Sequence, residues 1–406
     1  MEFNPETALA YARALARPRL VGSGEDEKVA QEIVAQLESF GYHVEREPFQ
    51  FTRAFDIMLG VEIAVALVLI LCAMLFANIA YVFGGVLFGL LFFSLPINST
   101  IRSNAVMPTG RQARKPDLLQ SFCFRLGRIY RTANIVARNW SPEPLIDNPE
   151  VVEAEDVPHL YLVAHYDSKS QRMPLVLRIA LSVLFMLGVV CFTAGALLPV
   201  LVSPYAPLAF GLGVFTIATG IPLLFLDVAN ASPGALDNAA GTGVVLHLAE
   251  VLRSRPDLFS KLRLTILITS AEEMATMGAS FHVIWNSQML EHDAGDRGLY
   301  VINFDGTGID GALYWAAEEV NGILPALIKS AGKEFRIPIR RFVFPGALFD
   351  HIPFAEYLFD TVTLMTIGKA SWAVHAAGDT PDKLNPRGFE MAGRVAMRVI
   401  ERVAGW

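Results

Sequence analysis

Five short segments of this sequence carry Asp, Glu or His residues in patterns that suit metal ligation. The central one is SPGALDNAAGTG, residues 232–243, in which Asp237 follows a turn of small residues and precedes a helix. A carboxylate has two oxygens that can each face a cation, so Asp237 is a natural bridge in a two-metal site. The other four segments would supply the terminal ligands, from His165, Glu272 with Glu273, Asp305 and His375.

Two of these segments combine residue types that suit different tasks. His165 and Asp167 end an apolar strand (HLYLVAHYD) two positions apart, so their side chains point to the same face. A carboxylate beside a ligating His can accept its second ring N–H and fix its tautomer. Glu272 and Glu273 follow the strand LRLTILITS, at the carboxyl end where α/β folds place their sites. One adjacent carboxylate can bind metal while the other takes a proton from water.

Each segment has an ordinary structural explanation when it is taken alone. A His at a strand end is often structural, and acidic residues are favoured in the first turn of a helix. Asp305 before a glycine is typical of a turn, and His375 fits a surface loop. Their co-occurrence favours chemistry, because two His and three carboxylates fit a pair of zinc-like ions about 3.5–4 Å apart. The sequence therefore predicts a two-metal hydrolase.

The order of the motifs HYD, GALDNAAGTG, SAEE, NFDG and HAAGDTPDKL resembles the M28 family of zinc peptidases, which includes aminopeptidases. The resemblance covers residues 5–52, 130–170 and 230–400. It implies an α/β, M28-type (phosphorylase/hydrolase-like) sandwich with a mostly parallel central sheet. It also implies a zinc-dependent aminopeptidase that binds two Zn²⁺ per chain and removes N-terminal residues from a peptide substrate.

The same resemblance assigns a role to each residue of the motifs. It implies one ion held by His165, Asp237 and Asp305, and a second held by Asp237, Glu273 and His375. Glu272 would be the general base, and Asp167 would orient His165. The sequence departs from some secreted members at Val374, where those members have a Tyr that helps stabilise the tetrahedral intermediate. That role is unassigned here, although Trp372 is nearby.

Two other functions compete with the aminopeptidase. HYDSK (residues 165–169) and DHIPF (residues 350–354) resemble glutaminyl cyclases, which share the fold and use one zinc ion. Asp350 also fits an N-cap for the helix that follows it, and His351 is a candidate for lining the site. The second alternative is a catalytically silent membrane receptor or scaffold. Such relatives usually lose ligands or the base, whereas all the expected positions are filled here.

The amino-acid composition indicates a membrane protein. The 406 residues are 53% hydrophobic and only 18% charged, and the mean hydropathy is +0.41. Much of the excess lies in two apolar blocks, 57–97 and 174–226, and each is long enough for about two spans of roughly 20 residues. Glu62 lies about one turn inside the first block, where it can reach the interface. We therefore expect an integral membrane protein with four transmembrane helices in the lipid bilayer.

Both blocks cross the bilayer an even number of times, so all soluble segments share one side. The flanks on that side carry many Lys and Arg residues and the far turns carry none, so the positive-inside rule predicts that the catalytic domain faces the cytoplasm. The basic flanks comprise Arg53, Arg102, Arg111, Arg114, Lys115, Arg125, Arg128, Arg131, Lys169 and Arg172.

The rest of the chain alternates strands and helices, as expected for an α/β domain. We expect strands at residues 42–51, 133–140, 159–167, 262–270, 298–306, 340–345 and 361–368, and helices at 5–17 and 26–40 and from Asn238, Met274, Leu324, Pro353 and Pro386. The predicted division is a catalytic domain in three parts, 1–54, 99–173 and 228–406, with transmembrane hairpins at 55–98 and 174–227.

The remaining features exclude some classes of function. The net charge of −7 gives no reason to expect a nucleic-acid partner. Three cysteines without a CxxC pair imply no disulfide framework. The other histidines are expected to be structural: His247 and His282 lie on helices, and the others lack carboxylate neighbours, namely His43, His159 and His292.

Overall fold

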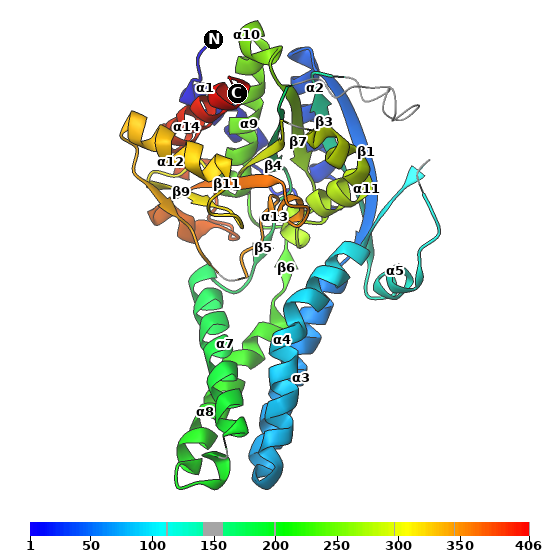
Figure 1. Cartoon of the computed structure of the whole chain (residues 1–406), viewed down its shortest axis with the longest axis vertical. Coiled ribbons are helices and arrows are strands. Elements are labelled where there is room, and N and C mark those ends of the chain that lie inside the picture. Colours follow the sequence, from blue (N-terminus) through cyan, green and yellow to red (C-terminus); the bar gives the residue numbers. More distant parts are fainter. Residues whose placement is uncertain (111–112, 141–156, 199, 296, 345, 406) are drawn as a thin grey trace.

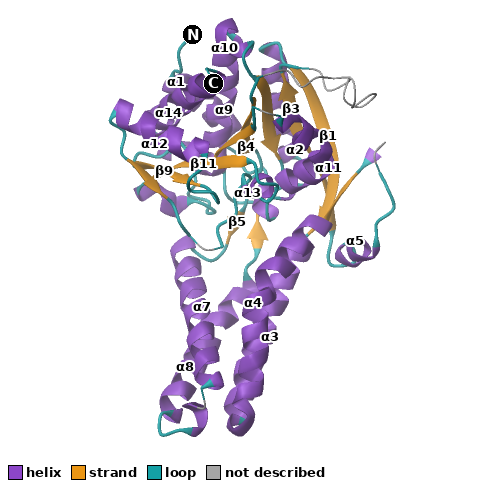
Figure 2. Cartoon of the chain, viewed as in Figure 1, coloured by secondary structure: helices purple, strands orange, loops and turns teal. Residues whose placement is uncertain are grey.

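The computed structural model describes residues 1–406 except 111–112, 141–156, 199, 296, 345 and 406. Arg111 of the predicted basic flanks therefore lies outside the described residues. An α/β part forms one end of the molecule, and two helical hairpins project from it side by side (Figures 1 and 2). Both chain termini lie at the end opposite the hairpins (Figure 1).

Nine strands of the described chain form the main sheet, in the order β10-β9-β11-β8-β4-β7-β3-β1-β2. A separate ribbon pairs β5 with β6. The strands are β1 His43–Thr52, β2 Val106–Pro108, β3 Ile129–Arg138, β4 His159–His165, β5 Ser170–Gln171, β6 Val228–Ala229, β7 Arg263–Thr269, β8 Leu299–Phe304, β9 Ala312–Ala316, β10 Ile339–Arg341 and β11 Asp360–Ile367.

The expectation of a mostly parallel sheet is wrong, because the sheet is mixed. β4 is parallel to β7 and β8, and β8 is parallel to β11, but β1, β2 and β3 form an antiparallel side. The chain leaves β1 into the first hairpin and re-enters β3 from the same end, so β3 must run back. β9 is antiparallel to β11, because residues 305–311 are too short a link for the crossover that a parallel strand requires.

Two faces of the central strands build two apolar cores. Leu160, Leu162 and Ala164 join the larger core, whereas Tyr161 and Val163 join the other, as the period of two along a strand requires. Helices α1, α2, α9, α12 and α14 cover the first face, and α11 and α13 cover the second. Their bounds, with that of the short α10, are α1 Pro5–Leu15, α2 Glu25–Ser39, α9 Ala240–Arg253, α10 Pro256–Phe259, α11 Met277–Ala294, α12 Ile323–Phe335, α13 Ile352–Ala355 and α14 Pro386–Ala404.

The projecting hairpins contain four helices that are long and apolar enough to cross a membrane, as the composition predicts. Hairpin 1 is α3 (Ala54–Leu75) and α4 (Ala80–Asn104), and hairpin 2 is α7 (Leu175–Leu197) and α8 (Ala206–Gly220) with the 3₁₀ turn Ile221–Phe225. They pack against each other through buried apolar side chains. Small residues allow close approach within hairpin 2, where a Cβ added at Gly188 would lie 2.4 Å from Thr216 Oγ1.

Glu62 is held inside hairpin 1. Its carboxylate accepts hydrogen bonds from Ser94 Oγ at 2.7 Å and from Asn98 Nδ2 at 2.9 and 3.0 Å. These bonds connect α3 to α4, so the one acidic residue of the block 57–97 links the two helices of the hairpin. Such polar contacts are the usual way in which an ionisable group is accommodated between apolar helices.

Candidate metal centre

Three adjacent parallel strands deliver the predicted residues to one edge of the sheet. His165 is the last residue of β4, Asp305 follows β8, and Glu272 and Glu273 form a 3₁₀ turn after β7. In the register of the sheet, Val163 pairs with Asn303 and His165 pairs with Thr269. The ends of β4, β7 and β8 are therefore level, and their next residues converge.

Asp237 reaches this edge from a separate turn, Ala235–Ala239, before α9. The turn is tied to the strand ends, because Thr242 Oγ1 donates to the His165 carbonyl at 2.8 Å and Asn238 Nδ2 donates to the Phe304 carbonyl at 2.7 Å. The Asp237–Asn238 peptide bond is cis. Gly234, with φ +58°, opens the turn, and a side chain there would collide with Ser168.

Two residues that the sequence analysis did not single out hold this turn. The Asp379 carboxylate accepts the backbone N–H groups of Leu236 at 2.6 Å and Asp237 at 3.3 Å. The fully buried Arg19 donates to the carbonyls of Pro233 at 2.6 Å and Gly234 at 2.9 Å. Asp379 lies within the HAAGDTPDKL motif, which was a usable signal, but nothing near Arg19 marks it.

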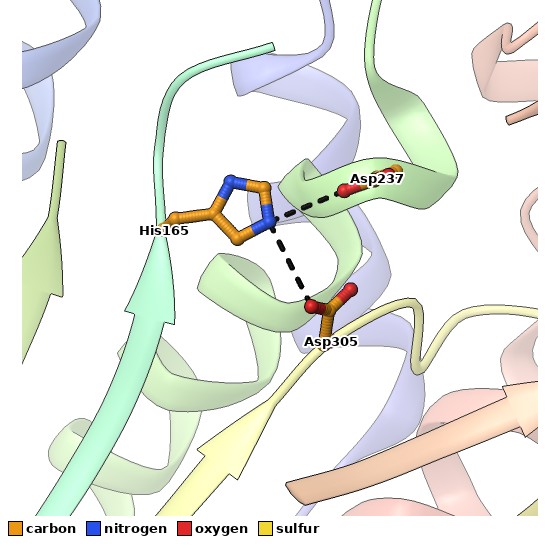
Figure 3. Close-up of side chains that lie close together, drawn as sticks. All are labelled: His165, Asp237 and Asp305. Atoms are coloured by element: carbon orange, nitrogen blue, oxygen red, sulfur yellow. Dashed lines mark ion pairs between the residues drawn. The ribbon is translucent and has the colours of Figure 1, made fainter. Parts of the chain in front are cut away.

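The first predicted ligand group is assembled. His165 Nε2 lies 3.2 Å from Asp237 Oδ1 and 4.0 Å from Asp305 Oδ2, and Figure 3 shows both carboxylates aimed at the same ring nitrogen. One ligand atom from each of the three residues lies within 4.8 Å of the others. His165 Nε2 is buried and has no hydrogen-bond partner in the described chain, so this donor set fits a divalent metal ion.

The second predicted group shares Asp237 with the first. His375 Nε2 lies 3.1 Å from Asp237 Oδ2 and 3.0 Å from Glu273 Oε2, and the three residues again offer ligand atoms within 4.8 Å. His375 arrives on the loop after β11, which ends at the same edge of the sheet. One Asp237 oxygen therefore faces each group, as a bridging carboxylate requires.

Cations of the chain itself contact the second group, and the sequence analysis gave them no role there. Lys169 Nζ lies 2.8 Å from Glu273 Oε2, and its backbone N–H donates to Glu273 Oε1 at 3.2 Å. Arg178 Nη2, from the first turn of α7, lies 2.8 Å from His375 Nδ1. Lys169 belongs to the HYDSK motif, whereas Arg178 lies in an apolar block that gave no signal of a role at the site.

Glu272 lies beside the first group without belonging to it. Its Oε2 is 3.7 Å from His165 Nε2. Burial, with the negative charges of Asp305 and Asp350, raises the pKa of Glu272 well above its usual value despite the opposing charge of His165. A buried carboxyl with a raised pKa is suited to accept a proton and give it back.

Asp167 has a different main contact from the one expected. Its carboxylate accepts the backbone N–H groups of Glu272 at 3.2 Å and Glu273 at 3.3 Å, and so holds both glutamates in place. His165 Nδ1 is nearer to the Asp167 carbonyl, at 3.2 Å, than to its carboxylate oxygen, at 3.6 Å. Both the carbonyl and the carboxylate of Asp167 therefore face His165 Nδ1.

The two groups differ in the charge states of their carboxylates. Burial, reinforced by the charge of Asp237, raises the pKa of Asp305 to about 7. Burial also opposes ionisation of Glu273, but His375 and Lys169 outweigh it and lower the pKa to about 2. For the shared Asp237, the contacts with His165 and His375 likewise outweigh burial and hold the pKa well below its usual value.

The DHIPF residues lie close to the site but outside both groups. Asp350 is buried and accepts a hydrogen bond from Thr269 Oγ1 rather than capping α13, whose first turn has no side-chain cap. Burial raises the pKa of Asp350 to about 7. His351 is buried with its Nδ1 2.6 Å from Thr363 Oγ1, so it packs in the core and does not join a ligand group. Trp372 is exposed and Val374 is half-buried.

Several of the remaining histidines make structural contacts. His247 Nε2 accepts the Asn4 N–H at 2.8 Å while its Nδ1 lies 2.9 Å from Glu250, and His282 Nδ1 lies 2.8 Å from Glu47. The expectation that His43 lacks a carboxylate neighbour is wrong, because Glu45 Oε1 is 3.4 Å away. None of these joins the metal-ligand groups found among the described residues.

Comparisons with known proteins identify a matching family and a shared fold. Residues 218–400 match the family model of Peptidase family M28. No curated protein matches the chain in sequence.

Solved structures of the same fold include enzymes of two activities. A zinc aminopeptidase from Bacillus subtilis is 13% identical, with a TM-score of 0.54 and coverage of 98% of this chain and 95% of that one. An aminopeptidase from Aneurinibacillus sp. strain AM-1 is 14% identical, with a TM-score of 0.54 and coverage of 99% and 94%. Glutaminyl cyclase from Porphyromonas gingivalis is 13% identical, with a TM-score of 0.51 and coverage of 98% of both chains.

At these identities the solved structures establish the fold alone, and the family model adds the M28 match over residues 218–400. The motifs, the fold and the family model therefore agree, and the resemblance of this chain to the M28 peptidases is confirmed.

Proposed function

We propose that this chain is a membrane-anchored, zinc-dependent aminopeptidase that binds two ions and removes N-terminal residues from peptides. The observation that carries the proposal is the pair of ligand groups that share Asp237, one with His165 and Asp305 and the other with Glu273 and His375. Each group offers nitrogen and carboxylate ligands of the kind that zinc prefers. A hydrolase is the activity that the M28 match supports.

Each residue of the site has a task in this proposal. Bound zinc ions would polarise the scissile carbonyl and lower the pKa of water. Glu272 accepts the proton of the attacking water and passes it to the leaving amine, for which its raised pKa is suited. Asp167 positions Glu272 and Glu273 through their backbone N–H groups.

A turnover assay tests the activity directly. Detergent-solubilised protein is given a peptide with a free amino terminus, the same peptide with an acetylated amino terminus, and a peptide that begins with Gln. Release of the first residue only from the free peptide is the expected result. Cleavage of both the free and the acetylated peptides, or of neither, contradicts the aminopeptidase assignment.

Glutaminyl cyclase is the second candidate, because HYDSK and DHIPF are present and Lys169 of HYDSK contacts a ligand residue. In the same assay, a cyclase closes the N-terminal Gln onto its own amino group and releases ammonia without cutting a peptide bond. Ammonia release without cleavage of the free peptide would replace the first proposal with the second. If neither reaction is observed, the non-catalytic scaffold is the alternative that remains.

The membrane anchoring is part of the proposal. It is supported by the four apolar helices and by their many exposed apolar side chains, among them Val68, Leu95 and Leu208. The contact of Arg178 with His375 supports a site close to the membrane surface, because it joins the first turn of α7 to a ligand residue. Substrates that are hydrophobic or membrane-derived fit such a site.

Chemical labelling of the variant Lys261→Cys tests the predicted cytoplasmic orientation. Lys261 is exposed and follows α10, at the end of the α/β part opposite the hairpins. An impermeant maleimide should label Lys261→Cys only after the cells are opened. Labelling in intact cells would place the domain outside and reverse the orientation.

A further inference from the structure

A short helix beside hairpin 1 presents an apolar face that no described residue of the α/β part covers. α5 spans Leu118–Cys123 and begins with a capping box, in which the Asp117 carboxylate accepts the Gln120 N–H at 2.8 Å. Leu118 is 93% exposed and Phe122, one turn later, is 47% exposed. Leu119 lies on the same face and is also exposed, so three large apolar side chains share this face.

The opposite face of α5 is anchored to the base of hairpin 1. Cys123 is buried, its carbonyl accepts a hydrogen bond from Thr52 Oγ1 at 3.1 Å, and its Sγ lies 3.9 Å from the Ile101 carbonyl. A Cβ added at Gly127 would lie 3.1 Å from Ile57 Cδ1. Ile57 belongs to the first turn of α3 and Ile101 to the last turn of α4, so α5 lies where hairpin 1 meets the α/β part (Figure 1).

The charge of the surrounding segment is strongly positive. Between 113 and 131 the only acidic residue is Asp117, whose carboxylate is used as the helix cap. All the basic residues of this segment are exposed, and they are Arg114, Lys115, Arg125, Arg128 and Arg131. Arg114 lies over the ring of Trp285, and Arg128 lies over the ring of Tyr130. These contacts hold two of the cations against the protein surface.

We propose that α5 and its basic flanks, residues 113–131, form an interfacial anchor that lies on an anionic lipid surface. An apolar helix face buried among acyl chains beside cations that contact headgroups is the usual arrangement of a helix in the membrane interface. We assign lipid to this face because α5 packs against the base of α4, whose hairpin is proposed to lie in the bilayer. The inference rests on the proposed membrane anchoring and is independent of the proposed catalysis.

Lipid quenching of a fluorescent label tests the anchor. The holoprotein is reconstituted in phosphatidylcholine vesicles, with or without phosphatidylglycerol, that contain brominated lipid. Single labels are placed at Leu118→Cys, at Val68→Cys in the middle of α3 and at Lys261→Cys, in a background where Cys72 and Cys191 are replaced by Ala. Cys123 is kept because it is buried.

The three labels separate this inference from the anchoring on which it rests. We expect strong quenching at position 68 and only background quenching at position 261. Quenching at 118 should be several-fold above that background, rise with anionic lipid and fall with added salt. Quenching at 68 without quenching at 118 overturns the interfacial anchor alone. No quenching at 68 overturns the membrane anchoring itself. Equal quenching at 118 in neutral and anionic vesicles overturns the assignment to anionic lipid.

A variant pair shows whether the apolar face causes the effect. Phe122→Asp in the Leu118→Cys background should remove the quenching, whereas Gln31→Asp, on the exposed face of α2, should leave it unchanged. A label at 118 that is shielded from water yet not quenched would mean that protein covers the face, and would overturn the lipid assignment.

Discussion

The two ligand groups share Asp237 but differ in how the chain compensates their charge. The group of His165 and Asp305 is surrounded by carboxylates, and burial raises the pKa of Asp305 to about 7. The group of Glu273 and His375 is contacted by Lys169 and Arg178, and the pKa of Glu273 falls to about 2. Among the described residues no Lys or Arg forms an ion pair with Asp237 or Asp305, whereas Lys169 pairs with Glu273 in the second group. Two sites that are alike in ligand type thus differ in their need for an ion.

The largest expected effect is the loss of both groups at once. Asp237→Ala removes the one carboxylate that faces both, so we expect both ions and all turnover to be lost. Elemental analysis of gently purified protein measures the ions per chain. Retention of a stoichiometric ion in this variant would show that at least one group does not depend on the bridge.

Splitting the two groups is the next test. Asp305→Asn should remove the ion of the first group and spare the second, and Glu273→Gln should do the reverse, because each residue belongs to one group only. The absorption spectrum of the Co²⁺-substituted protein reports the ligand set that remains. Identical spectra for the two variants would contradict the assignment of separate ligand sets.

Glu272→Gln isolates the proton acceptor from the ligands. The amide keeps the size of the side chain but cannot take a proton, so we expect unchanged metal content with kcat reduced by about 10²–10⁴-fold. Steady-state kinetics and metal analysis on the same preparation check both halves. A wild-type rate would remove Glu272 from the mechanism.

Lys169→Met tests whether the cation beside the second group weakens ion binding there. Removing the positive charge beside Glu273 Oε2 should lower the Kd of the second ion about tenfold and leave the Kd of the first ion unchanged. A tenfold change in Kd corresponds to about 1.4 kcal/mol, which one charge interaction at close range can supply. The control is Arg172→Met, because Arg172 is exposed and pairs with Asp227 rather than with a ligand residue. Isothermal titration with Zn²⁺ measures both affinities, and equal effects of the two variants would count against a local charge effect.

The smallest effect is a difference in pH dependence. A raised pKa means that Asp305 is protonated below pH 7 and ionised above it, so protons compete with the first ion as the pH falls through about 7. Glu273, with a pKa of about 2, stays ionised over this range. The imidazole pKa is raised in both groups, at His165 and His375, so that contribution is common to them. Titrations at pH 6 and pH 8 should therefore show a larger loss for the first ion, and equal losses would contradict the comparison.

Strand ends were predictable because their signal is local. An apolar run followed by His165, Glu272 or Asp305 predicts a buried strand with a polar residue at its end. Long apolar blocks likewise predicted the four helices of the hairpins. The strand β9 was missed, since ALYWA is short and half-buried, and the sheet direction was wrong because β1 and β3 pair across an inserted hairpin.

The sequence by itself determined which residues carry the chemistry and which segments are apolar enough for a membrane, because both are properties of residue type and local order. Only the tertiary structure decided which ligand group Lys169 and Arg178 contact. It also decided that Asp379 and Arg19 hold the Asp237 turn. The packing of α5 against hairpin 1 is likewise a result of the fold. These contacts join residues far apart in the chain. Strand register and the packing of separate helices create them, and neither is written in the spacing of residues along one segment.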